Sequence, residues 1–166
     1  DFEKLRDNVS RLLSIGNTHI HLDLIAGLPL EDFNSFRRSF NDVYEMKPHM
    51  LQLGFLKLLK GSGIRSRAED YGIEYNNFPP YEVIKTGSIS YSELLKLKRI
   101  EHVLNLYYNS GRFVNVLEYL LKKLDTTPFD FYKRLSEYWS SNDLLKGSKS
   151  LNDQYVILYR YVLTLE

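Results

Sequence analysis

Cysteine is absent from the 166-residue chain, which excludes disulfide bonds, thiolate zinc sites and cysteine-ligated iron–sulfur clusters within it. Neither sign of charge is in excess, because the chain has 22 basic and 21 acidic residues. Long apolar runs are also missing, since none approaches the ~20 residues that cross a bilayer. We therefore expect neither nucleic acid nor a membrane as a partner. A cysteine-free chain fits a reducing compartment, so we expect a cytoplasmic location.

Aromatic residues are abundant, with 13 tyrosines and 9 phenylalanines. Such residues usually fill cores and helix–helix contacts. Base stacking is the alternative interpretation, but it lacks the basic face that nucleic-acid binding needs. Because 43% of the chain is apolar, it can bury a substantial core.

The first 60 residues alternate between helical and strand patterns. Residues 2–15 predict an amphipathic helix, and residues 18–26 alternate apolar and polar side chains as a half-buried strand does. A second helix is predicted over 32–47 and a buried strand over 50–58. This order predicts a crossover connection and parallel, right-handed pairing of the two strands.

Later segments are first irregular and then helical. A short helix over 64–71, a loop over 76–80 and a weak third strand over 81–86 are expected. Ser90 and Glu93 form a capping-box pattern that begins a helix. Further helices are predicted over 90–109, 112–124, 128–141 and from 151 onward, with a polar linker over 142–150.

The fold class is therefore α/β, with two or three parallel strands followed by a mostly α-helical domain. We divide the chain into residues 1–65, an irregular linker over 66–89 and a helical domain over 90–166. Two parallel strands are a poor independent unit, because their edges and apolar faces need cover. We therefore expect the chain to be a fragment of a larger protein, in line with a start at Asp1 rather than Met.

His19, His21 and Asp23 alternate along the first predicted strand and share one face. Two imidazoles and a carboxylate could bind zinc or iron. Same-face neighbours on a strand lie ~6–7 Å apart, however, and converge poorly on one ion. We favour a polar strand face and predict no metal site.

Two glycine-containing turns follow the predicted strands. Gly27-Leu28-Pro29 could let a ligand approach a strand end, or be an ordinary turn. Lys60-Gly61-Ser62-Gly63 could cradle an anion, although a plain turn is the favoured interpretation because the P-loop spacing is missing. No hydrolase, metalloprotease or dinucleotide motif occurs, so no catalytic residue is predicted.

A family resemblance rests on two runs of sequence. Residues 23–29, Asp-Leu-Ile-Ala-Gly-Leu-Pro, with Phe36, Pro48 and the strand over 50–58, resemble two consecutive strands of a radical SAM partial (β/α) barrel, with the spacing of the oxygen-independent coproporphyrinogen oxidase branch. Residues 51–61, 80–84 and 107–110 resemble cobalamin-binding-domain radical SAM proteins of the Fe-S oxidoreductase type, which carry an uncharacterised helical domain.

The resemblance implies a function for the parent protein. In that family a Cys-x3-Cys-x2-Cys loop holds a [4Fe–4S] cluster, which reduces S-adenosylmethionine to a radical, and a further domain binds cobalamin. We expect none of these cofactors in the isolated chain, because it has no cysteine. By resemblance, Asp23 and Lys57 would contact S-adenosylmethionine, and Gly27 and Pro29 would shape the strand end beside them.

We thus expect an inactive C-terminal fragment that supplies part of a cofactor-binding barrel and an auxiliary helical domain. Its partner would be the missing N-terminal part of its own parent chain, or, in isolation, a second copy bound through the exposed strands. One alternative is a helical protein-interaction module without enzymatic role. Another is a stand-alone α/β binding domain, which would need both faces of its sheet covered.

Overall fold

The computed structural model describes residues 1–165 and shows an α/β chain with seven α-helices and two small sheets in that range. The chain divides into two compact units, residues 1–98 and 99–166, with the boundary inside a helix. Each unit is described by itself. The expected division at residues 65 and 90 remains a prediction. Within the described range, no helix has the length and apolarity needed to cross a bilayer.

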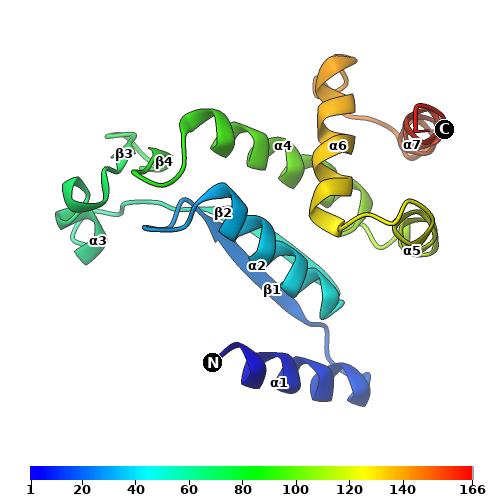
Figure 1. Cartoon of the computed structure of the whole chain (residues 1–166), viewed down its shortest axis with the longest axis horizontal. Coiled ribbons are helices and arrows are strands. Elements are labelled where there is room, and N and C mark those ends of the chain that lie inside the picture. Colours follow the sequence, from blue (N-terminus) through cyan, green and yellow to red (C-terminus); the bar gives the residue numbers. More distant parts are fainter. Residues whose placement is uncertain (166) are drawn as a thin grey trace. The chain divides into compact units, whose positions relative to one another are not determined.

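The first unit begins with a β–α–β arrangement (Figure 1). Helix α1 (Phe2–Ile15) precedes strand β1 (His21–Ala26), helix α2 (Phe33–Glu45) and strand β2 (Met50–Phe55). The two strands pair in parallel, from His21 opposite Met50 to Ala26 opposite Phe55. The expected parallel pairing is therefore confirmed, although β1 begins three residues later and β2 ends three residues earlier than expected.

Local sequence explains where the two helices begin and end. Asp1 caps α1 by accepting from the backbone N–H of Lys4, and Gly16 ends it in the left-handed conformation. Asp32 caps α2 by accepting from the N–H of Ser35 at 2.7 Å. The apolar side of α2 then packs inward through the buried residues Phe36, Phe40 and Val43. Each such burial stabilises the fold by roughly 1.5–3 kcal/mol.

The β1–β2 sheet has one covered face and one open face. Leu51 and Leu53 are buried on the covered face, and Ile20 joins Val9 of α1 and Met46 in a core cluster. The alternate residues, whose side chains point to the other face, are exposed (His21, Asp23, Ile25 and Gln52). The predicted alternation, with the apolar residues packed against helices, is confirmed.

A short antiparallel sheet follows β2. Helix α3 (Gly63–Ser66) and a 3-10 turn (η1, Glu69–Tyr71) lead to strands β3 (Glu74–Tyr75) and β4 (Val83–Lys85). The expected third parallel strand was wrong: the segment forms a strand, but it pairs antiparallel with β3. A parallel partner needs a crossover of a dozen or more residues, whereas the short loop between β3 and β4 permits only a hairpin.

The second unit is helical. Helix α4 (Tyr91–Tyr107) spans the unit boundary and is followed by α5 (Val114–Lys123), α6 (Pro128–Ser141) and α7 (Leu151–Leu163). The Ser90–Glu93 capping box is confirmed, since each residue's N–H donates to the other's side chain. The core of the unit consists of aromatic and aliphatic side chains with no more than 1% exposure (Ile100, Val103, Leu104, Tyr107, Phe113, Phe129, Phe131, Tyr132, Leu135, Trp139). Most of the phenylalanines, and part of the tyrosines, therefore fill cores, as the sequence predicts.

Tyr107 connects two helices of this core. Its hydroxyl donates to the backbone carbonyl of Gln154 at 3.1 Å, and its ring meets Phe113 edge-on at 4.9 Å. Burial raises the pKa of the Tyr107 phenol, so the neutral, donating form persists well above pH 10. The hydroxyl thus fixes α7 against the end of α4.

Substituting Tyr107→Phe should lower the free energy of unfolding by about 1 kcal/mol, because one buried hydrogen bond is lost while the ring packing remains. Urea denaturation monitored by circular dichroism measures this difference. Tyr119→Phe is the matched control, since Tyr119 is 61% exposed and should tolerate the change without loss. Equal stability of the two variants would contradict a structural role for the hydroxyl.

Candidate functional site

The open face of the β1–β2 sheet carries Asp23, which is exposed, as is Lys57 among the predicted site residues. Asp23 lies in the middle of β1, opposite Gln52, and its carboxylate is exposed. Within residues 1–165 this side-chain carboxylate makes no hydrogen bond or ion pair. Parallel sheets are normally covered on both faces. An uncovered parallel sheet with an unpaired carboxylate at its centre is therefore the strongest candidate for a binding surface.

Gly27, by contrast, is enclosed by its own chain. Its φ of +86° favours glycine, and a Cβ there would lie 2.7 Å from Cγ1 of Val83 and 3.7 Å from Cδ2 of Leu94. This close approach alone requires a glycine. The turn continues through the half-buried Pro29 to Leu30, which is 82% exposed and has a φ of +65°.

Lys57 follows the carboxyl end of β2. There, residues 81–83 pair antiparallel with residues 56–58. The N–H of Val83 donates to the carbonyl of Leu56, and the N–H of Leu58 donates to the carbonyl of Tyr81, both at 2.9 Å. Lys57 forms an isolated bridge with Glu82 between these bonds. Its own N–H and carbonyl take part in no hydrogen bond among the described residues, so they remain available to a ligand.

The predicted site residues form a line along the strands. Asp23 is level with Gln52, and Lys57 lies five residues beyond Gln52. At about 3.3 Å per residue the two positions are separated by roughly 16 Å. The structure thus does not bring Asp23 and Lys57 together around one atom. A ligand that touches both must be extended along the strands.

A cationic and aromatic cluster beside the end of β2 was not foreseen from the sequence. The Arg65 guanidinium lies 5.0 Å from the Tyr75 ring and 5.2 Å from the Tyr81 ring, and it donates to the carbonyl of Leu58 at 2.9 Å. Lys60 approaches the Tyr81 ring at 5.9 Å. Each cation–π contact contributes about 0.5–1 kcal/mol. No local signal could have found this cluster, because its members come from separate elements.

The Lys60–Gly63 segment closes on itself. The N–H and the hydroxyl of Ser62 both donate to the carbonyl of Leu59, and α3 begins directly afterwards. These bonds define an ordinary turn, which agrees with the favoured interpretation of this segment.

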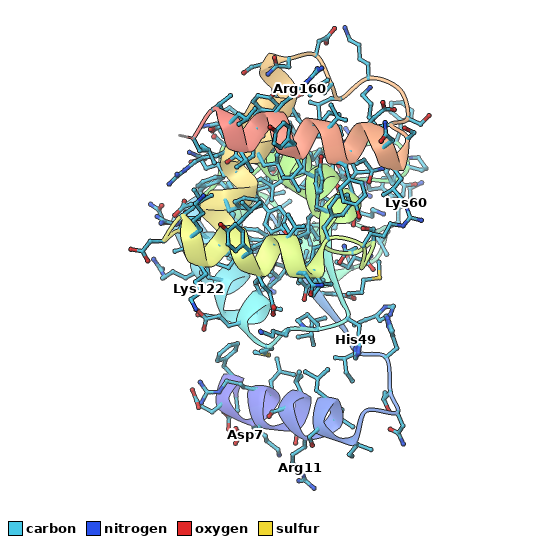
Figure 2. The ribbon with its side chains drawn as sticks, turned by 90° about the vertical axis from the view of Figure 1, so that its right-hand side faces the viewer. Asp7, Arg11, His49, Lys60, Lys122 and Arg160 are labelled. Atoms are coloured by element: carbon cyan, nitrogen blue, oxygen red, sulfur yellow. The ribbon has the colours of Figure 1, made fainter. Side chains whose placement is uncertain are left out.

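Three histidines meet at the opposite, amino-terminal end of the strands. His19 Nδ1 lies 2.7 Å from His21 Nε2, and the rings of His19 and His49 stack at 4.6 Å. His49 Nδ1 accepts a hydrogen bond from the N–H of Ile20 at 3.0 Å. Figure 2 shows His49 beside the loop that joins α1 to β1. Partial desolvation lowers the pKa of His19, and repulsion by His49 and His21 lowers it further.

The histidines do not form a metal site with Asp23. Among the residues that the structure describes, no group of three or more His, Asp or Glu side chains is placed to hold a metal ion. His49, which directly precedes β2, is the third member of the cluster in place of Asp23. The cluster joins the loop between α1 and β1 to the loop between α2 and β2, and its side chains do not converge on one point.

A cleft of about 330 Å³ lies between α1 and α2, lined by Phe2, Arg6, Ser10, Leu13, Asp42, Glu45 and Met46. Leu13 and Met46 belong to the cluster on the covered face of the sheet. The cleft is therefore on the side away from Asp23, since successive residues of a strand point to opposite faces.

Comparison with known families identifies the C-terminal three-fifths of the chain. The model of a family described as a protein of unknown function, DUF4080, matches residues 69–166. The chain belongs to the DUF4080 family. No curated protein matches it. The DUF4080 match begins at η1, so all four predicted site residues lie before it, and the family description assigns no role to them.

Gly27→Ala should lower the free energy of unfolding by about 3 kcal/mol, because it combines left-handed strain with a clash against Val83. Gly61→Ala is the matched control: φ is +82° there, but nothing lies within 4 Å of the added Cβ. Its loss should be only about 1 kcal/mol. Urea denaturation of both variants measures the difference. Equal losses would show that the contact with Val83 is not limiting.

The histidine cluster should make the first unit less stable in mild acid. Because the folded-state pKa of His19 lies below 6.5, the unfolded chain binds more protons, and stability falls as pH drops from 6.5 through the folded-state value. A histidine NMR titration measures that pKa directly. His49→Gln should raise it toward 6.5 by removing a neighbouring imidazole. A His19 pKa at or above 6.5 in the unaltered chain would contradict the proposed contact.

Proposed function

We propose that this chain supplies part of the S-adenosylmethionine-binding wall of a radical SAM protein of the cobalamin-binding type, together with an auxiliary DUF4080 domain. The observation that carries the proposal is the open polar face of a parallel β–α–β unit, with Asp23 at its centre. Support also comes from the family, because DUF4080 is found in radical SAM and cobalamin-binding proteins. The barrel itself would be completed by residues outside this chain.

The residues fit an extended, positively charged ligand. An unpaired carboxylate at Asp23 attracts a cationic amino or sulfonium group. The free backbone groups of Lys57 can hydrogen-bond to a polar moiety about 16 Å further along. Gly54 lies between them on the same face and adds no side chain. Asp23 would bind and orient the cofactor, and Gly27 and Pro29 would hold the neighbouring turn in place.

The chain does not fit an iron–sulfur cluster, since it offers no thiolate. In the proposed protein the cluster is held by residues outside this chain, and the cofactor contributes radical chemistry once it is bound there. The isolated chain would then be one wall of a binding site without a reaction centre.

The alternative function, a protein-interaction module, is favoured by one specific observation. Several apolar side chains of α5 and α7 are exposed, among them Tyr119 at 61% and Tyr159 at 65%. Exposed apolar patches of this kind mark interaction surfaces. The two functions are compatible, because they use different units of the chain.

Asp23→Asn in the full-length protein should weaken S-adenosylmethionine binding roughly 10- to 100-fold, because a hydrogen bond to a charged group contributes about 1.5–3 kcal/mol. Calorimetric titration measures the dissociation constant. Asp70→Asn, an exposed carboxylate at η1, is the matched control and should leave it unchanged.

The isolated chain should release no 5′-deoxyadenosine from S-adenosylmethionine under reducing conditions, even after treatment with iron and sulfide. Production above the level of a protein-free sample would overturn the proposed dependence on residues outside the chain. Unchanged affinity in Asp23→Asn would remove Asp23 from the site.

A further inference from the structure

Helix α7 is apolar on two sides. One side faces the core of the second unit through Ile157, Leu158 and Tyr161, which are at most 7% exposed. The other side faces solvent and is also apolar. The residues on this side, called the outer face of α7, are between 39% and 65% exposed (Tyr155, Val156, Tyr159 and Leu163). The Tyr155 ring also contacts Phe113, with 4.6 Å between ring centroids, so Val156, Tyr159 and Leu163 are the more open part of this face. At 100° per residue, these four positions lie opposite the core-facing ones, and Asn152 in the first turn is the polar residue on the same side.

A surface helix normally carries polar residues opposite its buried stripe, and a helix that is apolar all round is buried. Only two residues of α7 are charged, Asp153 and Arg160. They are seven residues apart, two turns along one flank, so neither interrupts the outer face. Figure 2 shows α7 toward the viewer, with Arg160 at its edge. The helix therefore needs a second layer of packing.

We propose that the outer face of α7 packs against the same face of a second copy of this chain, antiparallel and about a two-fold axis. Apolar surfaces are self-complementary, as a symmetric interface requires. With the helices crossing near Val156 and Tyr159, Tyr159 of one copy lies against Val156 of the other.

The charges on the flank select the antiparallel direction. A two-fold axis perpendicular to both helices brings the same flank of each copy together with opposite chain direction. Arg160 of one copy then lies beside Asp153 of the other, twice in the interface. The Asp153 side chain can take part, because its Oδ2 alone accepts the two capping bonds from Ser150. In a parallel two-fold arrangement the two charged flanks would lie on opposite sides of the interface, and these pairs could not form.

Two other exposed surfaces fit a second copy less well. The open edge and face of β1 present His21 and Asp23, so the dimer through strands expected from the sequence would bury polar groups. The solvent side of α5 carries Lys122 and Lys123 against one carboxylate, Glu118, so its net positive charge makes it less suited to its own copy. Of the three surfaces compared, α7 has opposite charges two helical turns apart on one flank of an apolar face, which is a self-complementary order.

The expected interface is modest in area. The two tyrosines together expose roughly 200 Å². Even with the aliphatic residues added, the outer face remains smaller than the ~800 Å² that each partner buries in a standard interface. The dimer should therefore be reversible, with a dissociation constant on the order of 10 µM.

Sedimentation velocity of the whole chain between about 1 and about 200 µM tests the proposal. The unaltered chain should shift from its 19.6 kDa monomer to twice that mass. Tyr159→Lys should remain monomeric throughout, with unchanged circular dichroism, because its side chain is 65% exposed. Tyr91→Lys, a similarly exposed tyrosine at 54% in the first unit, should dimerise as the unaltered chain does.

Charge reversal tests the direction of packing. Arg160→Glu should weaken the dimer at least about tenfold, since it places two carboxylates side by side, whereas Lys4→Glu on α1 should not. A monomer at all concentrations would overturn the proposal, as would a dimer that survives Tyr159→Lys or is abolished by Ile25→Lys on β1. If Arg160→Glu weakens the dimer no more than Lys4→Glu, the antiparallel arrangement is wrong.

Discussion

The parallel pairing of β1 with β2 is the constraint on which the first unit depends. Parallel neighbours need a crossover, and α2 provides it across one face of the pair. That face takes up Ile20, Leu51 and Leu53, while the pleat directs Asp23 to the other face. A single helix cannot cover both faces, so the side that carries the carboxylate stays open. The proposed binding surface follows directly from this geometry.

The carboxyl ends of the strands are shaped by the chain's own later segments. Val83 packs against Gly27, and the backbone around Glu82 extends the end of β2. Glu82 also forms an ion pair with Lys98, whose ammonium lies 5.1 Å from the Phe55 ring. These contacts give the glycine turn a packing role that is independent of any ligand. Among the described residues, the Asp23 carboxylate and the backbone N–H and carbonyl of Lys57 are not used in these contacts, so a cofactor could bind them.

The core of the helical unit is built largely from aromatic rings that pack edge to face. Trp139 meets both His102 and Tyr107 edge-on, and Phe131 meets Tyr161 in the same way. Burial raises the pKa of Tyr161 to about 12, as expected for a phenol largely removed from water. The same helix that supplies Tyr161 presents Tyr159 outward, with 65% of that residue exposed. The DUF4080 domain is thus saturated with aromatics inside and still apolar on one outer surface.

The sequence by itself determined the order and type of most elements, because the amphipathic periods, the Ser90 and Thr127 caps and the breaks at Gly16 and Pro48 are local signals. It also determined that Asp23 lies opposite the apolar side of β1, since that follows from alternation. Only the tertiary structure decided that β4 pairs with β3, that Gly27 faces Val83, and that Arg65 joins Tyr75 and Tyr81. These contacts join segments distant along the chain, and distance in sequence carries no periodic signal of which surfaces will meet.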